Sequence, residues 1–126
     1  MRAKFIYESL TDYLEPKSNE DIINDLSKLS SYQLRDSLLS SAANDKIDRV
    51  KMLIDAGANI ESKSLSGLTP LLYAARYGHK DVAEILLKAG ANINAEDNDG
   101  WNALHYAIHH KRKDLEILLK KYGAEE

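Results

Sequence analysis

Apolar residues recur every three or four positions along most of the chain, the spacing that places them on one face of an α-helix. The first two apolar stripes consist of Phe5, Ile6, Leu10, Tyr13 and Leu14, and of Ile22, Ile23, Leu26 and Leu29. The first stripe stops before Pro16, and the second follows Ser18, a residue type that favours helix starts. Ser30 and Gln33 have the spacing of a capping box, which predicts a further helix from about Tyr32 to Ala43.

A longer pattern repeats every 33 residues. The letters AGANI at 56–60 return at 89–93, and the related YGA stands at 122–124. Gly67 and Gly100 are separated by the same interval, so the AGANI segment and this second glycine position indicate the same period. Thr69 can cap a helix and Pro70 suits its first position, while Asn102 takes the cap in the next unit. The stretch NAEDNDG at 94–100 is rich in turn-forming residues, which predicts a hairpin between units.

Residues 67–95 read GLTPLLYAARYGHKDVAEILLKAGANINA. They closely resemble the ankyrin repeat, whose pattern is G-x-T-P-L-H-x-A-A-x-x-G-H, then a helix rich in Val and Leu, then G-A-x-x-N. Residues 100–124 keep the landmarks Gly100, Leu104, His105, Ala107, Leu118, Leu119, Gly123 and Ala124, and residues 34–62 match mainly in their second half. The resemblance implies an all-α, ankyrin-type helical repeat solenoid with short hairpin fingers. It divides the chain into an N-terminal helical cap or extension, 1–33, and three ankyrin-like repeats in 34–126, at about 34–66, 67–99 and 100–126.

The two ends of such a stack are expected to differ from its middle, because a two-helix unit cannot bury its apolar face alone. The second helix of each repeat has two equivalent positions four residues apart. They hold Val50 and Ile54 in the first repeat, Ala83 and Leu87 in the second, and Glu116 and Lys120 in the third. The last pair is charged, which predicts an ion pair and an array that stops with the third repeat. Residues 1–33 are expected to cover the first repeat. The alternative is that they form a separate partner-binding or dimerising element.

Composition narrows the classes of function. The chain has 126 residues, no cysteine and a formal net charge of −3. Cysteine nucleophiles, disulfides and thiolate metal sites are therefore excluded, and the charge provides no general attraction for nucleic acid or anionic lipid. The basic residues at 111–113 and 120–121 are offset by neighbouring acids and are interpreted as a solvated face. Without a long apolar run or a signal-peptide core, the chain is expected to be intracellular and cytoplasmic, and to bind neither nucleic acid nor membrane.

In the ankyrin family, partner contacts usually come from the fingers and from the concave face of each first helix. Carried onto this chain, the resemblance predicts a partner-binding set of Leu65, Ser66, Leu68, Tyr73, Arg76, Tyr77, Asn98, Asp99, Trp101, Tyr106, His109 and His110. The first repeat offers only the small residues Ser40, Ala43 and Asn44. Because Trp, Tyr and Arg dominate binding energies at interfaces, the hot spot is expected at Tyr73, Arg76, Tyr77, Trp101, Tyr106 and His109. The alternative roles are packing between repeats for Tyr73 and Tyr106, and shielding of the hairpin for Trp101.

The histidines raise the question of a metal or catalytic site. His105 and His109 are four positions apart on one predicted helix, a spacing at which two imidazoles can share a metal ion, but no third ligand is placed by sequence. The resemblance puts His105 in the T-P-L-H motif and His79 in the G-H turn, which implies structural roles. No nucleophile triad, phosphate loop or dinucleotide fingerprint is present. We expect no catalytic residue, no metal and no cofactor.

Together these features predict a protein–protein interaction module, an adaptor, scaffold or inhibitor that binds a protein partner through its concave face and fingers. The alternative is a self-assembling structural protein that uses the N-terminal helices or the aromatic patch. A monomer is expected over a homo-oligomer. A metal-dependent enzyme is a third hypothesis.

Overall fold

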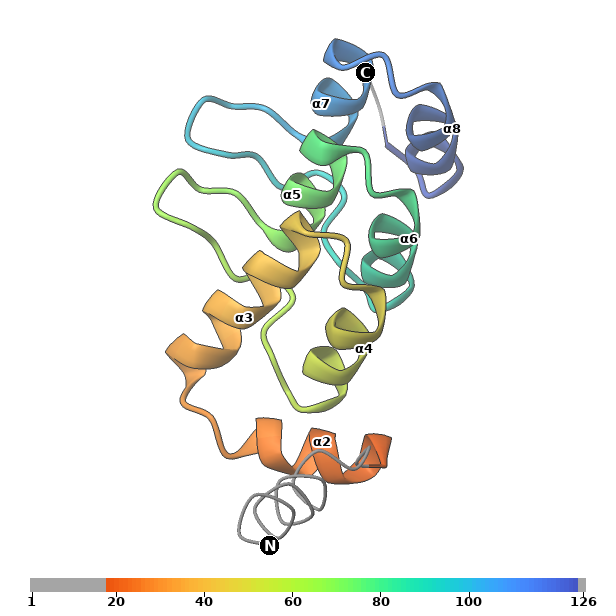
Figure 1. Cartoon of the computed structure of the whole chain (residues 1–126). Helices are drawn as coiled ribbons and strands as arrows, with labels where there is room; N and C mark the ends of the chain where they lie inside the picture. Colours follow the sequence, from red (N-terminus) through yellow and green to blue (C-terminus); the bar gives the residue numbers. More distant parts are fainter. Residues whose placement is uncertain (1–17, 125–126) are drawn as a thin grey trace, which may run out of the picture.

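The computed structural model describes residues 18–124, which form seven helices and no strand. The helices are α2 (Asn19–Ser27), α3 (Ser31–Ala43), α4 (Ile47–Asp55), α5 (Pro70–Tyr77), α6 (Lys80–Lys88), α7 (Ala103–His109) and α8 (Lys113–Lys121). Figure 1 shows α3, α5 and α7 stacked as an inner layer and α4, α6 and α8 as an outer layer, with two hairpins projecting from the inner side. The expected all-α repeat fold is confirmed. The predicted helix before Pro16 lies outside the described residues.

Helix α2 and the three inner helices begin where the sequence places their caps. The hydroxyl of Ser30 accepts the backbone N–H of Gln33, and the Gln33 side chain accepts the N–H of Ser30, which completes the predicted capping box. Thr69 accepts the N–H of Leu72 at the start of α5, and Pro70 occupies the first helical position. Asn102 and Ser18 cap α7 and α2 in the same way.

The turns between inner and outer helices require a left-handed residue. Gly78 has φ +76°, and the residues at its equivalent positions, Asp45 and Lys111, have φ +57° and +56°. Side chains other than glycine are strained in this region, so the first and third turns hold strain that the second does not. An added Cβ at position 78 would also lie 2.7 Å from the guanidinium of Arg112, the end of a flexible and exposed side chain that would have to shift.

A continuous apolar core runs between the two layers of helices. Its fully buried leucines include Leu38, Leu53, Leu71, Leu86, Leu104, Leu115 and Leu119. Ala74 and Ala75 are also fully buried, and their small size lets α5 pack closely against α3 on one side and α7 on the other. The fold therefore depends on contacts between neighbouring repeats as much as on contacts within one.

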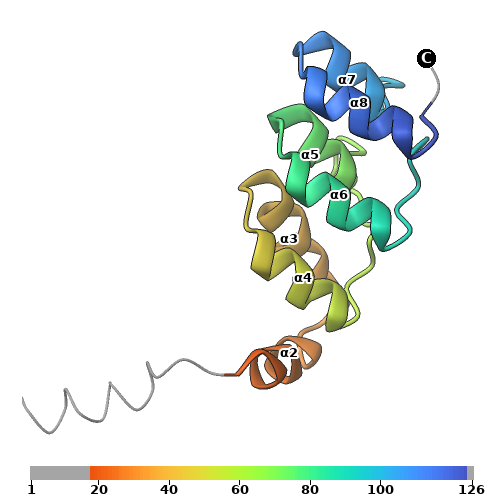
Figure 2. The same ribbon diagram turned by 90° about the vertical axis from the view of Figure 1, so that its right-hand side faces the viewer.

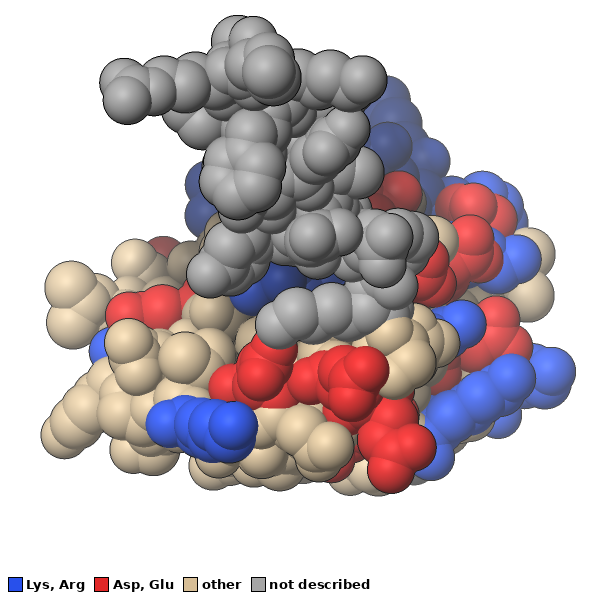
Figure 3. All heavy atoms as spheres, turned by 60° about the horizontal axis from the view of Figure 1, so that its bottom comes forward, with Lys and Arg blue, Asp and Glu red and all other residues tan. Residues whose placement is uncertain are grey.

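At the N-terminal end, α2 lies across the outer helix of the first repeat. It packs against α4 (Figure 2), and its Leu26 side chain is buried at 7% exposure. The rest of α2 is acidic, with Glu20, Asp21 and Asp25 and no basic residue. Figure 3 views the chain from this end, where acidic side chains gather on part of the surface.

At the other end, the third repeat replaces buried apolar positions with polar or exposed ones. Ala83 is fully buried, but its equivalent Glu116 is partly exposed, and Leu87 is replaced by exposed Lys120. The Nζ atom of Lys120 lies 3.2 Å from Oε1 of Glu116, which confirms the predicted ion pair. This hydrogen bond from Lys120, together with nearby Lys113, holds the pKa of Glu116 below its ordinary value.

Candidate functional site

Two hairpins with the same hydrogen-bond pattern form one wall of the candidate site. In the first finger, residues 62–68, the N–H of Ser64 donates to the carbonyl of Leu68 at 3.0 Å. In the second finger, residues 95–101, the N–H of Asp97 donates to the carbonyl of Trp101 at 2.9 Å. The same positions, one period apart, also supply a side-chain acceptor, the hydroxyl of Ser64 and the carboxylate of Asp97. The fingers are therefore ordered by their own hydrogen bonds.

Asn98 fastens the second finger to the first. Its backbone N–H donates to the carbonyl of Ser66 at 3.0 Å, and its Nδ2 donates to the carbonyl of Leu65 at 2.9 Å. Gly67 sits against this contact, since a Cβ at that position would collide with the Asn98 side chain. Asn98 is one of the predicted partner contacts, and in the structure its hydrogen bonds join the tips of the two fingers.

Asp97 anchors the second finger to the inner helix behind it. The carboxylate is 9% exposed, and it accepts hydrogen bonds from the Tyr106 hydroxyl and from the backbone N–H groups of Asp99 (2.9 Å) and Trp101 (3.0 Å). Burial opposes ionisation, but these hydrogen bonds and the charge of Arg76 outweigh it, so the pKa of Asp97 lies below its ordinary value. Burial and the adjacent Asp97 carboxylate raise the pKa of Tyr106 to about 12.

Beside this anchor lies a hollow of about 360 Å³ that spans the second and third repeats. We call it the second groove, because another groove lies nearer the N-terminal end of the stack. The second groove is lined by Arg76, Asp99, Trp101, Tyr106, His109 and His110. The Trp101 ring lies 5.1 Å from the ring of Tyr106 and 5.0 Å from that of His109, measured between centroids. The rings of Tyr106 and His110 are nearly parallel at 6.3 Å. These contacts hold the aromatic side chains in place around the groove.

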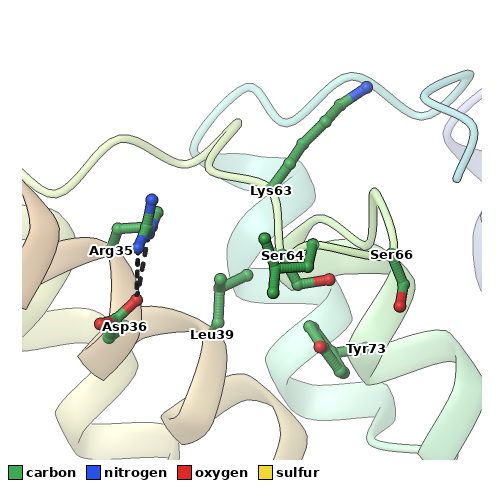
Figure 4. Close-up of a pocket in the computed structure, with 8 residues that line it drawn as sticks. Arg35, Asp36, Leu39, Lys63, Ser64, Ser66 and Tyr73 are labelled. Carbon is green, nitrogen blue, oxygen red and sulfur yellow. Dashed lines mark hydrogen bonds and ion pairs between the residues drawn. The ribbon is translucent and has the colours of Figure 1, made fainter. Parts of the chain in front are cut away.

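The first groove lies between α3 and the first finger, with a volume of about 440 Å³. Its lining consists of Arg35, Asp36 and Leu39 from α3, Lys63, Ser64, Leu65 and Ser66 from the finger, and Tyr73 from α5. Figure 4 shows the Arg35–Asp36 ion pair on the helix side and the two serines opposite it, with Leu39 between them. Tyr73 is half-buried and its ring stacks on that of Tyr77 at 6.4 Å.

The structure therefore brings nine of the twelve predicted residues together in these two grooves. Leu65, Ser66 and Tyr73 line the first groove, and the other six line the second. Tyr77 is 45% exposed beside Tyr73 and under the guanidinium of Arg76. The prediction is wrong for Leu68, which is 3% exposed and belongs to the apolar core. Leu68 lines neither groove, so it offers no surface to a partner there.

Sequence reasoning missed the α3 side of the first groove. It assigned only Ser40, Ala43 and Asn44 to the first repeat, whereas Arg35, Asp36 and Leu39 face the finger. The available signal was the capping box at Ser30, because it starts α3 far enough upstream for these residues to stand beside the finger.

The histidines take mainly structural positions. The Nδ1 atom of His105 accepts the N–H of Asn102 at 3.2 Å, which completes a capping box at the start of α7. The Nε2 atom of His79 lies 2.9 Å from the carbonyl oxygen of Ala43. Across residues 18–124, no group of three His, Asp or Glu side chains has the arrangement of a metal site. The same part of the chain contains no helix long and apolar enough to cross a membrane.

Comparison with known families gives one result for this architecture. A family model for ankyrin repeats matches residues 38–126, with three copies. The match starts within α3 and extends through α8. A search of curated proteins finds none that matches the chain.

Proposed function

The chain belongs to the ankyrin repeat family, and because repeats of this family are protein–protein interaction modules, we propose that it binds another protein through its concave face and fingers. The single observation that carries the proposal is the second groove. There, Arg76, Trp101 and Tyr106 from two repeats surround one hollow of about 360 Å³. These are the residue types that most often dominate binding energy when an interface covers them.

The accessibility of the side chains supports this surface. Arg76, His109 and His110 are exposed, and Tyr77 is 45% exposed. Within the described residues, Arg76 forms no ion pair, and its guanidinium stacks over the Tyr77 ring at 5.5 Å. Arg76 is exposed and lines the second groove, so its guanidinium is accessible to a partner's carbonyl or carboxylate.

The rigidity of the surface also favours binding. The Asp97–Tyr106 hydrogen bond and the two Asn98 contacts fix the fingers before any partner arrives. A preorganised surface orders few additional groups on association, so less conformational entropy opposes binding. This suits an adaptor, scaffold or inhibitor that presents one fixed surface.

Ankyrin repeat proteins are typically non-enzymatic, and we propose the same for this chain. The perturbed groups Asp97 and Tyr106 support this proposal, because each is engaged by the other. Their pKa shifts accompany a structural hydrogen bond that joins a finger to a helix. Shifts of this kind arise in structural networks as well as in active sites.

The proposal is tested by photo-crosslinking in source-cell lysate. A photoreactive amino acid at position 77 is expected to capture a partner, whereas the same group at Ile117, which is 61% exposed on α8, is expected to capture none. The combined variant Arg76→Ala, Tyr77→Ala and His110→Ala should abolish capture from a reporter at Asp99. A matched variant of exposed convex residues, Lys51→Ala, Lys88→Ala and Ile117→Ala, should leave it unchanged. Equal capture by both variants would overturn the concave surface as the binding site.

Self-assembly is the competing proposal and predicts a different result. Capture of only the chain's own copies at position 77, together with a sedimentation coefficient that rises with concentration, would favour assembly. A concentration-independent monomer that crosslinks to another protein would instead support the interaction module.

A further inference from the structure

We propose that the first groove binds a partner segment in which an apolar side chain stands next to an acidic one. The inference rests on the proposed binding function and assigns the chemistry of one part of the partner. It concerns the side of the surface formed by α3, which the repeat pattern leaves unassigned.

The groove exists because the first inner helix is longer than the others. Helix α3 has 13 residues, whereas α5 has 8 and α7 has 7. Within the described residues no finger precedes α3, and the chain enters it directly from α2 through the Ser30 cap. Figure 1 shows the first turns of α3 reaching out beside the first finger. The start of α3 therefore stands beside the first finger, whereas the second finger has the first finger as its neighbour.

The floor of the groove suits an apolar side chain. Leu39 is 8% exposed and Tyr73 is half-buried, so both leave part of their surface facing the hollow. Leu65, at the tip of the finger, is fully exposed at 103%. A partner's aliphatic or aromatic side chain placed here would remove apolar surface on both molecules from water.

The charge of the lining selects an acidic neighbour. Arg35 and Asp36 form an ion pair at 3.0 Å and offset each other, as the dashed lines in Figure 4 show. Lys63, on the finger side, is exposed and has no ion-pair partner among residues 18–124. The groove therefore has one uncompensated positive charge beside it, carried by a flexible side chain that extends away from the hollow in Figure 4. A carboxylate beside the apolar side chain complements this charge, whereas a basic residue would be repelled by Lys63.

The finger wall is held in place from behind. Asn98 bonds the carbonyls of Leu65 and Ser66, and the Ser64 hydroxyl accepts the N–H of Leu68 at 3.2 Å. The shape of the finger wall is therefore set before binding, so few groups of the finger have to be ordered when a segment binds.

Peptide selection tests the proposal directly. A random peptide library displayed on phage is selected against the intact chain, and the affinity of each enriched peptide is measured by fluorescence polarisation. We expect enriched peptides to combine Asp or Glu with an adjacent aliphatic or aromatic residue. Lys63→Glu is expected to weaken their binding about five- to tenfold, because it replaces attraction by repulsion beside the groove. Lys121→Glu makes the same charge change at an exposed site on α8 and should leave the affinity unchanged.

Nitrogen-15 NMR titration then locates the peptide. Shift changes at Arg35, Ser64 and Tyr73 support the proposal. Enriched peptides without acidic residues, or with equal affinity for Lys63→Glu, would overturn it, as would a concentration-dependent dimer that Lys63→Glu dissociates. Shift changes confined to Arg76, Trp101 and His110 would overturn this inference while leaving the proposed binding function standing. Failure to select any peptide, combined with no crosslinked partner at position 77, would count against both.

Discussion

The Nε2 atom of His79 lies 2.9 Å from the carbonyl oxygen of Ala43, so the residue that begins the second outer helix is bonded to the last residue of the first inner helix. Because a carbonyl oxygen only accepts, Nε2 must carry the proton in this hydrogen bond. One period later, Arg112 precedes α8 and its guanidinium packs over Gly78 at the end of α5. The residue before an outer helix thus joins each later repeat to the one before it.

Replacing His79 by alanine is expected to lower the free energy of unfolding by about 1 kcal/mol, because the Ala43 carbonyl loses its side-chain donor in a part-buried place. Urea denaturation measures the change. Lys51→Ala removes an exposed side chain from α4 and should change stability by less than about 0.5 kcal/mol. Equal effects of the two substitutions would contradict a linking role for His79.

Lys111→Gly is expected to stabilise the chain by about 0.5 kcal/mol. Lys111 has φ +56°, a conformation that glycine adopts without strain, although glycine also loses more entropy on folding. Gly78→Ala should act in the opposite direction, because it introduces the strained φ and requires the guanidinium of Arg112 to shift from its place over residue 78. Thermal unfolding of the two variants and the wild type compares these effects. A lower unfolding midpoint for Lys111→Gly than for the wild type would show that the lysine side chain stabilises the fold by more than its strained backbone destabilises it.

Alkaline titration should reveal the raised pKa of Tyr106. Its pKa is raised to about 12, above the unfolded value near 10, so its contribution to stability is complete below pH 10 and is lost as the pH rises towards 12. The ultraviolet absorbance of tyrosinate is expected to show a late-titrating group that is absent from Tyr106→Phe. If the titration curve of that variant matches the wild-type curve in shape, the Asp97 hydrogen bond does not control this tyrosine.

Acid titration tests the other partner of the same hydrogen bond. The pKa of Asp97 is lowered in the folded chain, so its contribution to stability is present above the unfolded pKa of about 3.8 and is lost as the pH falls through the folded pKa. Asp97→Asn should therefore destabilise the chain near neutral pH, by about 1–2 kcal/mol for the lost charged hydrogen bonds. The difference from wild type should shrink below about pH 4. A difference that is independent of pH would assign the effect to packing alone.

The local features of the fold could be predicted from the sequence because neighbouring residues decide them. The caps at Ser30, Thr69 and Asn102 each bond a backbone N–H three residues ahead, so a short sequence window contains both partners. The left-handed turn at Gly78 and its strained equivalents are local in the same way. The period extends this reasoning along the chain, since it places equivalent residues in equivalent positions of successive repeats.

The candidate site depended on contacts between segments that lie far apart in the sequence. Leu68 and Trp101 are one period apart, and the repeat pattern treats them alike, but Leu68 is buried in the middle repeat and Trp101 is only half-buried in the last. Arg35 and Lys63 border one groove because a long helix α3 stands beside a finger. The capping box at Ser30 indicates where α3 starts, but only the stacking of the repeats brings the helix and the finger together. Sequence by itself determined the helices, their caps and the repeat, because short-range hydrogen bonds and helical periodicity control them. Only the tertiary structure decided which side chains reach the surface, because burial depends on the neighbours that stacking brings together.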